Sequence, residues 1–155
     1  MSSAALLRGR VSGIGNWYVV TSVCHRRSDR FAGLEPAAIV VDELRLSDAR
    51  GATESLAWVV MPDHLHWLLR LSAGTLAQAV QGFKSRSAHR ISRMSGEPGR
   101  VWQAGYYDHL VRDEAALRKH ARYLLDNPRR RGLATRFEDY PHAWCRWASC
   151  ADELW

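Results

Sequence analysis

The 155-residue chain has few of the features that would place it in a membrane, outside the cell or among disulfide-stabilised proteins. Its N-terminal apolar run covers only residues 4–7, which is too short for a signal peptide or a membrane span. It has three cysteines and no Cys-x-x-Cys pair, which argues against a disulfide framework or a zinc ribbon and favours a reducing compartment. Together with the absence of internal repeats, these observations favour one globular domain in the cytoplasm, without a membrane partner.

Acidic residues are scarce in the middle of the chain, so the net charge of +6 is strongly localised. Residues 1–63 are neutral overall, residues 64–136 carry a net charge of +9, and residues 137–155 carry a net charge of −3. A localised positive field is typical of a surface that binds a polyanion, because Lys and Arg release counterions from the phosphates they neutralise. A solvated charged surface is the alternative. We therefore divide the chain into a domain at residues 1–136 and an acidic, aromatic tail at residues 137–155.

Hydrophobic periodicity predicts an α+β domain. We expect strands at residues 16–23, 55–61, 65–71 and 101–112, and helices at residues 36–48, 75–94 and 114–127. Pro62 and Asp63 form a turn that makes the second and third strands antiparallel neighbours. Thr75 and Asp113 are placed to cap the helices that follow them. The tail has no clear period, and part of it is compatible with a last strand.

A His-x-His sequence follows the predicted turn, at His64 and His66. Side chains alternate along a strand, so both imidazoles point to one face of the sheet and can converge on one cation. A surface strand that happens to carry two histidines is the alternative for so short a pattern. A second group of residues downstream favours the site.

That second group lies on the last predicted helix and directly after it. Tyr123 shares a helix face with Lys119, four residues before it, and with Asn127, four residues after it. A tyrosine hydroxyl can attack a phosphodiester at neutral pH only where a metal or positive charges favour the phenolate. Lys119 and the run Arg129–Arg131 supply such charges. This pattern makes Tyr123 the candidate nucleophile.

The same residues offer two nitrogens and one oxygen to a divalent cation. The candidate ligands are His64, His66 and the side-chain oxygen of Asn127, which leave positions for phosphate and water on an octahedral Mg²⁺ or Mn²⁺. Zinc also suits this ligand chemistry. In that case His109 or His120 could complete the site in place of Asn127.

Basic side chains on the helices and after the last of them are candidates for contact with DNA. Three arginines on the helix at residues 75–94 recur at spacings of four and three, which can place them along neighbouring phosphates. The candidate DNA contacts are Lys84, Arg86, Arg90, Arg93, Lys119, Arg129, Arg130 and Arg131. A solvated helix face is the alternative for the three arginines. Tyr106 and Tyr107, the rival nucleophiles, are interpreted as packing or base-stacking groups.

Several motifs together resemble the single-tyrosine HUH transposases, and within them the REP-associated tyrosine transposases of bacteria. The motifs are Met61–Leu69 (MPDHLHWLL), Phe83–Ser85 (FKS), Trp102–His109 (WQAGYYDH), Tyr123–Pro128 (YLLDNP) and Arg131–Leu133 (RGL). They extend over about residues 16–133. The Asn-Pro pair resembles the REP-associated branch, because classical insertion-sequence relatives tend to have glutamine at the equivalent place.

The resemblance implies a ferredoxin-like α+β fold, an antiparallel sheet of four to five strands with helices packed mainly on one face. It implies a bacterial, nucleoid-associated monomer that cleaves and rejoins single-stranded DNA beside imperfect palindromic hairpins, although a dimer stays open. His64 and His66 would be the metal-binding pair, and Asn127 the polar ligand. Tyr123 would form a 5′-phosphotyrosine and leave a free 3′-hydroxyl, and attack by a DNA hydroxyl would reverse the step without a nucleotide cofactor.

Three function classes remain open at this point. They are the metal-dependent transesterase, a hairpin-binding protein without useful catalysis, and a metal-dependent phosphodiester hydrolase with a water nucleophile. The charge of the tail adds a hypothesis, in which residues after about Tyr140 fold over the basic surface and compete with DNA.

Overall fold

The computed structural model describes residues 13–147 of the chain. The elements are β1 (Trp17–Val23), η1 (His25–Arg27), α2 (Leu34–Ala49), β2 (Thr53–Met61), β3 (His64–Leu71), α3 (Leu76–Ser95), β4 (Tyr107–Val111), α4 (Glu114–Leu125), α5 (Asn127–Arg130), η2 (Phe137–Asp139) and β5 (Ala143–Cys145). Each predicted strand and helix is present, with shifted ends in several cases.

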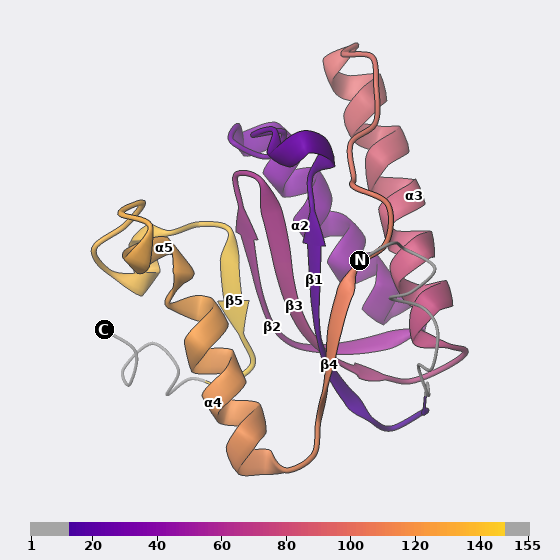
Figure 1. Ribbon diagram of the computed structural model, residues 1–155, viewed down its shortest axis with the longest axis vertical. Coiled ribbons are helices and arrows are strands. Elements are labelled where there is room, and N and C mark those ends of the chain that lie inside the picture. The colour runs from indigo at the N-terminus through magenta and orange to yellow at the C-terminus, as the bar shows by residue number, and fades with distance from the viewer. Residues whose placement is uncertain (1–12, 148–155) are drawn as a thin grey trace.

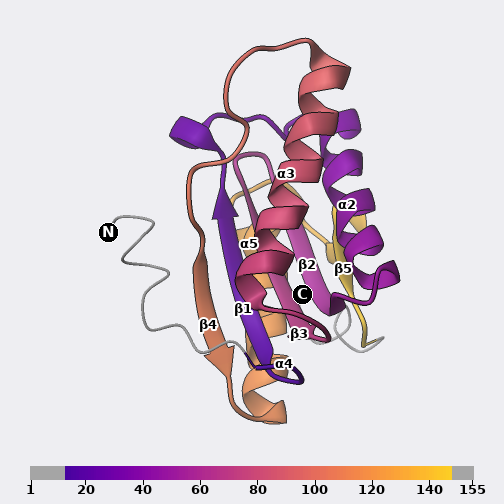
Figure 2. The ribbon, with the colours of Figure 1, turned by 90° about the vertical axis from the view of Figure 1, so that its right-hand side faces the viewer.

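All five strands form one antiparallel sheet in the order β4-β1-β3-β2-β5. The first four strands, with one helix after β1 and one after β3, have the connectivity of a ferredoxin-like fold. Figure 2 shows α2 and α3 side by side against one face of the sheet, and Figure 1 shows α4 beyond the opposite face. The predicted fold class is confirmed, with α4 as the helix that does not share the common face.

Side-chain alternation along the strands separates two cores. On β3, Leu65, Trp67 and Leu69 pack into the core formed with α2 and α3. Leu68, which points the other way, packs with the buried face of α4. Side chains two apart on a strand share a face, so the side chains two and four residues before Leu68 also point toward α4. That side of the sheet carries the histidine pair.

The turn between β2 and β3 is held by the loop that follows β1. The last pair of the hairpin joins Met61 to the first residue of β3, so Pro62 and Asp63 form the turn as predicted. The carbonyl oxygen of Asp63 accepts from the Cys24 backbone N–H at 2.9 Å, and that of Pro62 accepts from the Phe31 N–H at 3.0 Å. The start of β3 is therefore anchored at both backbone carbonyls of the turn.

The strand predicted at residues 101–112 is shorter than expected, because it begins only at Tyr107. The loop before Tyr107 is held by Lys84 of α3. The Nζ atom of Lys84 donates to the carbonyl oxygens of Gln103 at 2.7 Å and Gly105 at 2.5 Å. Trp102 is buried and donates its indole N–H to Ser87. Where the aromatic pattern predicts a continuous strand, the structure has these contacts and one isolated bridge between Trp102 and Cys24.

Residues 143–145 of the tail belong to the sheet. β5 pairs with β2, and the Tyr140 hydroxyl donates to the Val60 carbonyl oxygen at 2.6 Å. The prediction of a last strand is confirmed. A chain that ends at Tyr140 would lose β5, so such a truncation cannot separate competition with DNA from loss of the sheet edge.

The cysteines and the hydropathy of the helices can be compared with the predictions from composition. Cys24 is free and buried, whereas Cys145 is disulfide-bonded, which the number and spacing of the cysteines did not predict. Among the helices of residues 13–147, none combines the length and the hydropathy that a membrane span needs.

Candidate functional site

The imidazoles of His64 and His66 lie together on the side of the sheet that faces α4. Their ring centroids are 4.7 Å apart and the ring planes meet at 82°. The side chain of His64 is largely buried and that of His66 is partly exposed. Both rings therefore occupy one face, as the alternation of the strand predicts.

Each imidazole is oriented by a hydrogen bond at Nδ1. His64 Nδ1 lies 2.7 Å from Asp63 Oδ1, and His66 Nδ1 lies 2.9 Å from the Thr21 hydroxyl on the neighbouring strand. Outer partners of this kind hold a ring in one orientation and support metal binding through its other nitrogen. The arrangement leaves Nε2 of each ring as the nitrogen available to a cation.

Both imidazoles are suited to bind a metal because burial favours their neutral form. Burial lowers the pKa of His64, although the hydrogen bond with Asp63 partly offsets it. Burial, followed by the charges of His64, Arg130 and Arg27, lowers the pKa of His66 to about 3. Neutral imidazole is the form that coordinates metal ions.

Asp63 remains ionised beside this pair. Its burial on its own would raise the pKa of the carboxyl group, but the hydrogen bond from His64 and the charges of Arg131 and Arg27 lower the pKa overall. Arg27 Nη1 lies 3.6 Å from Asp63 Oδ2, and Arg131 Nη2 lies 4.0 Å from Oδ1. The carboxylate of Asp63 therefore connects the histidine pair to Arg131, which directly follows α5.

Tyr123 lies on the outer side of α4 and is 64% exposed. The helix buries its other face, including Leu124, against the sheet. The guanidinium carbon of Arg130 lies 4.2 Å from the centroid of the tyrosine ring, and Arg130 Nη2 donates to the Tyr123 carbonyl oxygen at 3.0 Å. The same guanidinium contributes to the lowered pKa of His66. Arg130 therefore contacts the tyrosine ring and also influences His66.

Asn127 begins α5 and is partly exposed. Its side-chain Nδ2 donates to the Leu124 carbonyl oxygen at 3.1 Å, which orients the amide. This hydrogen bond uses the nitrogen of the amide and does not involve Oδ1, the atom predicted as a metal ligand.

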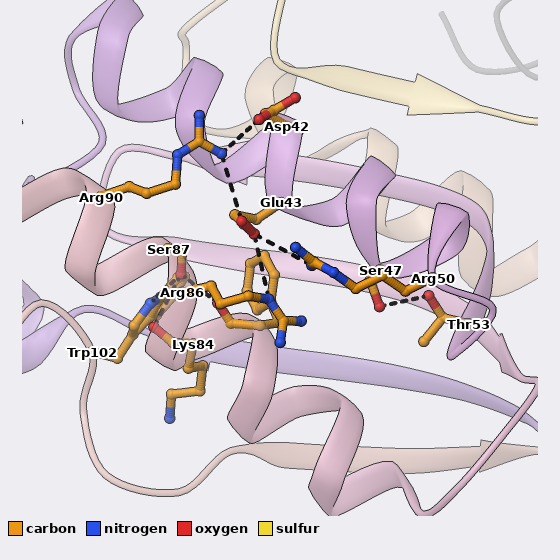
Figure 3. Close-up of polar contacts among 11 residues, drawn as sticks. Asp42, Glu43, Ser47, Arg50, Thr53, Lys84, Arg86, Ser87, Arg90 and Trp102 are labelled. Carbon is orange, nitrogen blue, oxygen red and sulfur yellow. Dashed lines mark hydrogen bonds and ion pairs between the residues drawn. The ribbon is translucent and has the colours of Figure 1, made fainter.

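Three of the predicted DNA contacts take part in internal interactions. Lys84 is 6% exposed and holds the loop described above. Arg86 and Arg90 each lie 3.6 Å from the buried carboxylate of Glu43, and Arg90 also pairs with Asp42 at 2.5 Å, as Figure 3 shows. The spacing that suggested a phosphate-binding stripe instead places two arginines against α2. Each of these three residues therefore has a partner within the protein.

The other predicted DNA contacts lie at the surface. They are Arg93, Lys119, Arg129, Arg130 and Arg131. Asp126 pairs with Arg129 at 2.8 Å and with Arg130 at 3.5 Å. These short-range pairs leave the guanidinium groups at the surface of the segment that adjoins the tyrosine.

His109 and His120 form a separate pair. Their ring centroids are 5.0 Å apart, and they join β4 to α4. Within residues 13–147, no group of three His, Cys, Asp or Glu side chains is placed to hold a metal ion. The alternative in which one of these two histidines completes a zinc site with the His-x-His pair is therefore wrong.

Sequence reasoning missed the outer partners of the histidines. The sequence pattern places Asp63 only in a turn, although its position directly before His64 is a signal for the hydrogen bond. Thr21 gave no local signal, because it reaches His66 only through the register of β1 and β3.

The fold and this group of residues are those expected of a tyrosine transposase, and comparison with known proteins gives the family. Residues 44–127 match the family model described as transposase IS200 like. Because the match covers more than half of the chain, the chain belongs to the IS200-like transposase family. It is therefore an enzyme of the tyrosine transposase class, and the resemblance drawn from its motifs is confirmed.

Two curated relatives carry the same description. A REP-associated tyrosine transposase of Escherichia coli (strain K12) is 27% identical over 133 residues, which cover 82% of this chain and 74% of the relative. A putative REP-associated tyrosine transposase of Haemophilus influenzae is 25% identical over 101 residues, which cover 58% of this chain and 57% of the relative.

Two solved structures share the fold. A REP-associated tyrosine transposase bound to a REP hairpin superimposes with a TM-score of 0.71 at 22% identity, over 86% of this chain and 79% of that one. A putative transposase from Deinococcus radiodurans gives a TM-score of 0.55 at 24% identity, over 77% of this chain and 94% of that one.

Proposed function

We propose that this enzyme cleaves and rejoins single-stranded DNA beside imperfect palindromic hairpins, with Tyr123 as the nucleophile. The observation that carries the proposal is the histidine pair itself. His64 and His66 stand 4.7 Å apart with both Nδ1 atoms occupied, on the side of the sheet that faces the tyrosine helix. A relative of the same fold has been solved with a REP hairpin, which supports a DNA hairpin as the partner.

The residues present fit a divalent cation. His64 and His66 would hold it through Nε2, with Oδ1 of Asn127 as the third protein ligand, and this mixed set suits Mg²⁺ or Mn²⁺. When bound, such a cation stabilises negative charge on the non-bridging oxygens of the scissile phosphate.

Tyr123 carries out the bond exchange. Its Oη gives up its proton to solvent and forms a bond to phosphorus while the bond from phosphorus to the 3′-oxygen breaks, and the 3′-oxygen leaves and takes up a proton to become a hydroxyl. The 5′-phosphotyrosine keeps the phosphate in ester linkage, so a DNA hydroxyl can later reverse the step. Arg130, directly over the ring, stabilises the negative charge that the tyrosine oxygen carries as it attacks.

Exposed basic side chains would hold the phosphates around the reacting one. We assign this role to Arg93, Lys119, Arg129, Arg130 and Arg131, and we leave out the three basic residues that are committed to internal interactions. Contacts of this kind position the strand without reading its sequence.

We propose that the enzyme acts as a monomer. Arg131 of the segment after α5 pairs with Asp63, the partner of His64, and Arg130 stacks on Tyr123 in the same chain. The tyrosine helix and the histidine strand are thus connected without a second copy. We place the activity in the bacterial cytoplasm, where the enzyme would associate with the nucleoid through DNA.

A labelled single-stranded hairpin, incubated with Mg²⁺ or Mn²⁺, tests the proposal. We expect a covalent protein–DNA adduct that is stable in denaturant, is lost in Tyr123→Phe and is strongly reduced in His66→Ala. The variant Arg136→Gln, an exposed arginine paired with Asp139 in the tail, is the matched control and should form the adduct normally. Binding without cleavage would favour a hairpin-binding protein, and cleavage without an adduct would favour a hydrolase.

A further inference from the structure

An exposed aromatic side chain lies on the same face of the sheet as the histidine pair. Tyr106 is buried in the core under α2 and α3. Because successive side chains of an extended segment alternate, Tyr107 points to the opposite face, the face of α4. Its side chain is 47% exposed. An aromatic ring on this face is therefore accessible from solvent.

Thr21 of β1 places this ring in line with the site. On one side Thr21 pairs with His66, and on the other side it pairs with Tyr107. The hydrogen bond from the Thr21 side chain to His66 puts that side chain on the face in question. Neighbouring strands are ~4.8 Å apart, so the backbones of Tyr107 and His66 are about 10 Å apart. The two side chains occupy one row across the sheet, close enough for one short stretch of DNA to contact both.

This row is open, whereas the sheet further along the same strands is covered. Leu68 of β3 and Val111 of β4 are buried in the core with α4. His66, Thr21 and Tyr107, in contrast, all retain exposed surface. The helix therefore covers the far part of this face and leaves the part beside the histidine pair accessible.

We propose that Tyr107 is a base-stacking residue for a nucleotide next to the scissile phosphate. This inference rests on the proposed function of the histidine pair. The base of a strand whose phosphate lies at His66 would extend over Thr21 and stack on the tyrosine ring at the edge of the sheet. Aromatic rings of this kind hold unpaired bases through stacking.

The proposal assigns a direction to the bound strand and a role in choosing the bond that is cut. A base held on β4 fixes which phosphate lies at the histidine pair, because the separation of the two side chains is set by the sheet. Tyr107 would be a positioning residue, and its ring rather than its hydroxyl would act.

Fluorescence of a base analogue tests the proposal without catalysis. In the Tyr123→Phe background with Mg²⁺, hairpin oligonucleotides would carry a fluorescent adenine analogue at successive positions on both sides of the cleaved phosphate. We expect quenching on binding at one position beside that phosphate. Tyr107→Thr should remove this quenching and weaken binding about tenfold, as expected for one stacked base. Tyr107→Phe should preserve both.

His109→Thr is the matched control. His109 lies on the same strand and face, but it pairs with Val19 rather than with Thr21, so its loss should leave the quenched position unchanged. Threonine is a good strand residue, and Tyr107→Val is a second ring-less variant that separates stacking from any effect of the threonine hydroxyl.

The outcomes separate this inference from the proposed function. If Tyr107→Thr and Tyr107→Val bind and quench as the parent does at every position, the stacking role is wrong while the proposed function stands. If the parent does not bind the hairpin at all, both fail. If Tyr107→Phe abolishes the covalent adduct in a chain that retains Tyr123, the hydroxyl rather than the ring is required, which also overturns the inference.

Discussion

At the scale of single residues, Asp63 has two tasks that its place in a turn does not suggest. It closes the hairpin between β2 and β3, and its carboxylate accepts the hydrogen bond that orients His64. The hydrogen bond with His64, followed by the charges of Arg131 and Arg27, keeps the pKa of this carboxyl group low although Asp63 is only 7% exposed. Asp63 thus links one imidazole to two arginines from distant parts of the chain.

Replacing Asp63 with asparagine should weaken metal binding. The amide cannot match the charged acceptor at His64 Nδ1, so we expect the affinity for Mn²⁺ to fall about 10–100-fold. Titration of free Mn²⁺ by electron paramagnetic resonance measures this directly. Asp42→Asn, on the face of α2 that contacts α3, is the control and should bind like the parent. Equal affinities for all three proteins would contradict the role of Asp63.

Removing the charge over the nucleophile should slow the reaction more than it weakens binding. Arg130→Gln keeps a polar side chain near Tyr123 but removes the cation that lies 4.2 Å from its ring. We expect adduct formation under single-turnover conditions to slow by about 10–100-fold, because stabilisation of charge in the transition state is lost. Hairpin affinity should change much less. A variant that forms the adduct at the parental rate would show that Arg130 does not assist Tyr123.

At the scale of elements, α2 and α3 are joined by a buried carboxylate surrounded by arginines. Glu43 is 2% exposed and lies within 3.8 Å of Arg50 and 3.6 Å of both Arg86 and Arg90. A buried charge is tolerated only when it is paired, so each of these cations contributes to holding the two helices together. Arg86 and Arg90 of α3 are therefore part of the fold.

Arg86→Ala should consequently destabilise the protein without changing its affinity for DNA. Glu43 would keep two of its three cations, and we expect a loss of about 1–3 kcal/mol in the free energy of unfolding. Urea denaturation and hairpin binding, measured on the same preparation, separate the two effects. Arg93→Ala, an exposed position on the same helix, should change the stability by less than about 0.5 kcal/mol. Weaker DNA binding by Arg86→Ala at unchanged stability would restore the DNA-contact interpretation.

The stability that Tyr140 gives to the protein should fall at alkaline pH. Burial raises the pKa of Tyr140 to about 12, and its hydroxyl donates to the carbonyl oxygen of Val60. A folded-state pKa above the ordinary value of 10.0 gives stability that is complete below pH 10 and declines as the pH rises toward 12.

Tyr140→Phe tests this linkage. The variant lacks the hydrogen bond and should be about 1 kcal/mol less stable than the parent at pH 8. The difference should shrink between pH 10 and pH 12, because only the parent loses stability through this ionisation. Unfolding curves at pH 8, 10 and 11 measure the difference. A gap that stays constant would contradict the assignment.

At the scale of the whole molecule, the fold followed from local patterns and the site followed only in part. His64 and His66 were predictable because a strand has a fixed period of two, and Thr75 because a capping box is a local signal. The ion pairs of α3 could not be predicted, because its arginines pair with carboxylates some 40 residues earlier in the chain. Thr21 needed the register of two strands, which periodicity does not give.

The two faces of the sheet carry different groups of residues. The face covered by α2 and α3 holds the larger core and the network around Glu43. The face of α4 carries the histidine pair, and the tyrosine and the basic segment belong to the elements on that side. Charge along the sequence could locate the basic region, but only the fold separates the arginines of one face from those of the other.

The most direct measurement is to identify the amino acid that becomes linked to DNA. After incubation of the protein with a single-stranded hairpin and Mn²⁺, trypsin digestion followed by mass spectrometry would locate the nucleotide-bearing peptide. The account predicts that it is residues 123–129, modified at Tyr123 through a 5′-phosphate. Modification at Tyr107, or cleaved DNA without any modified peptide, would contradict it.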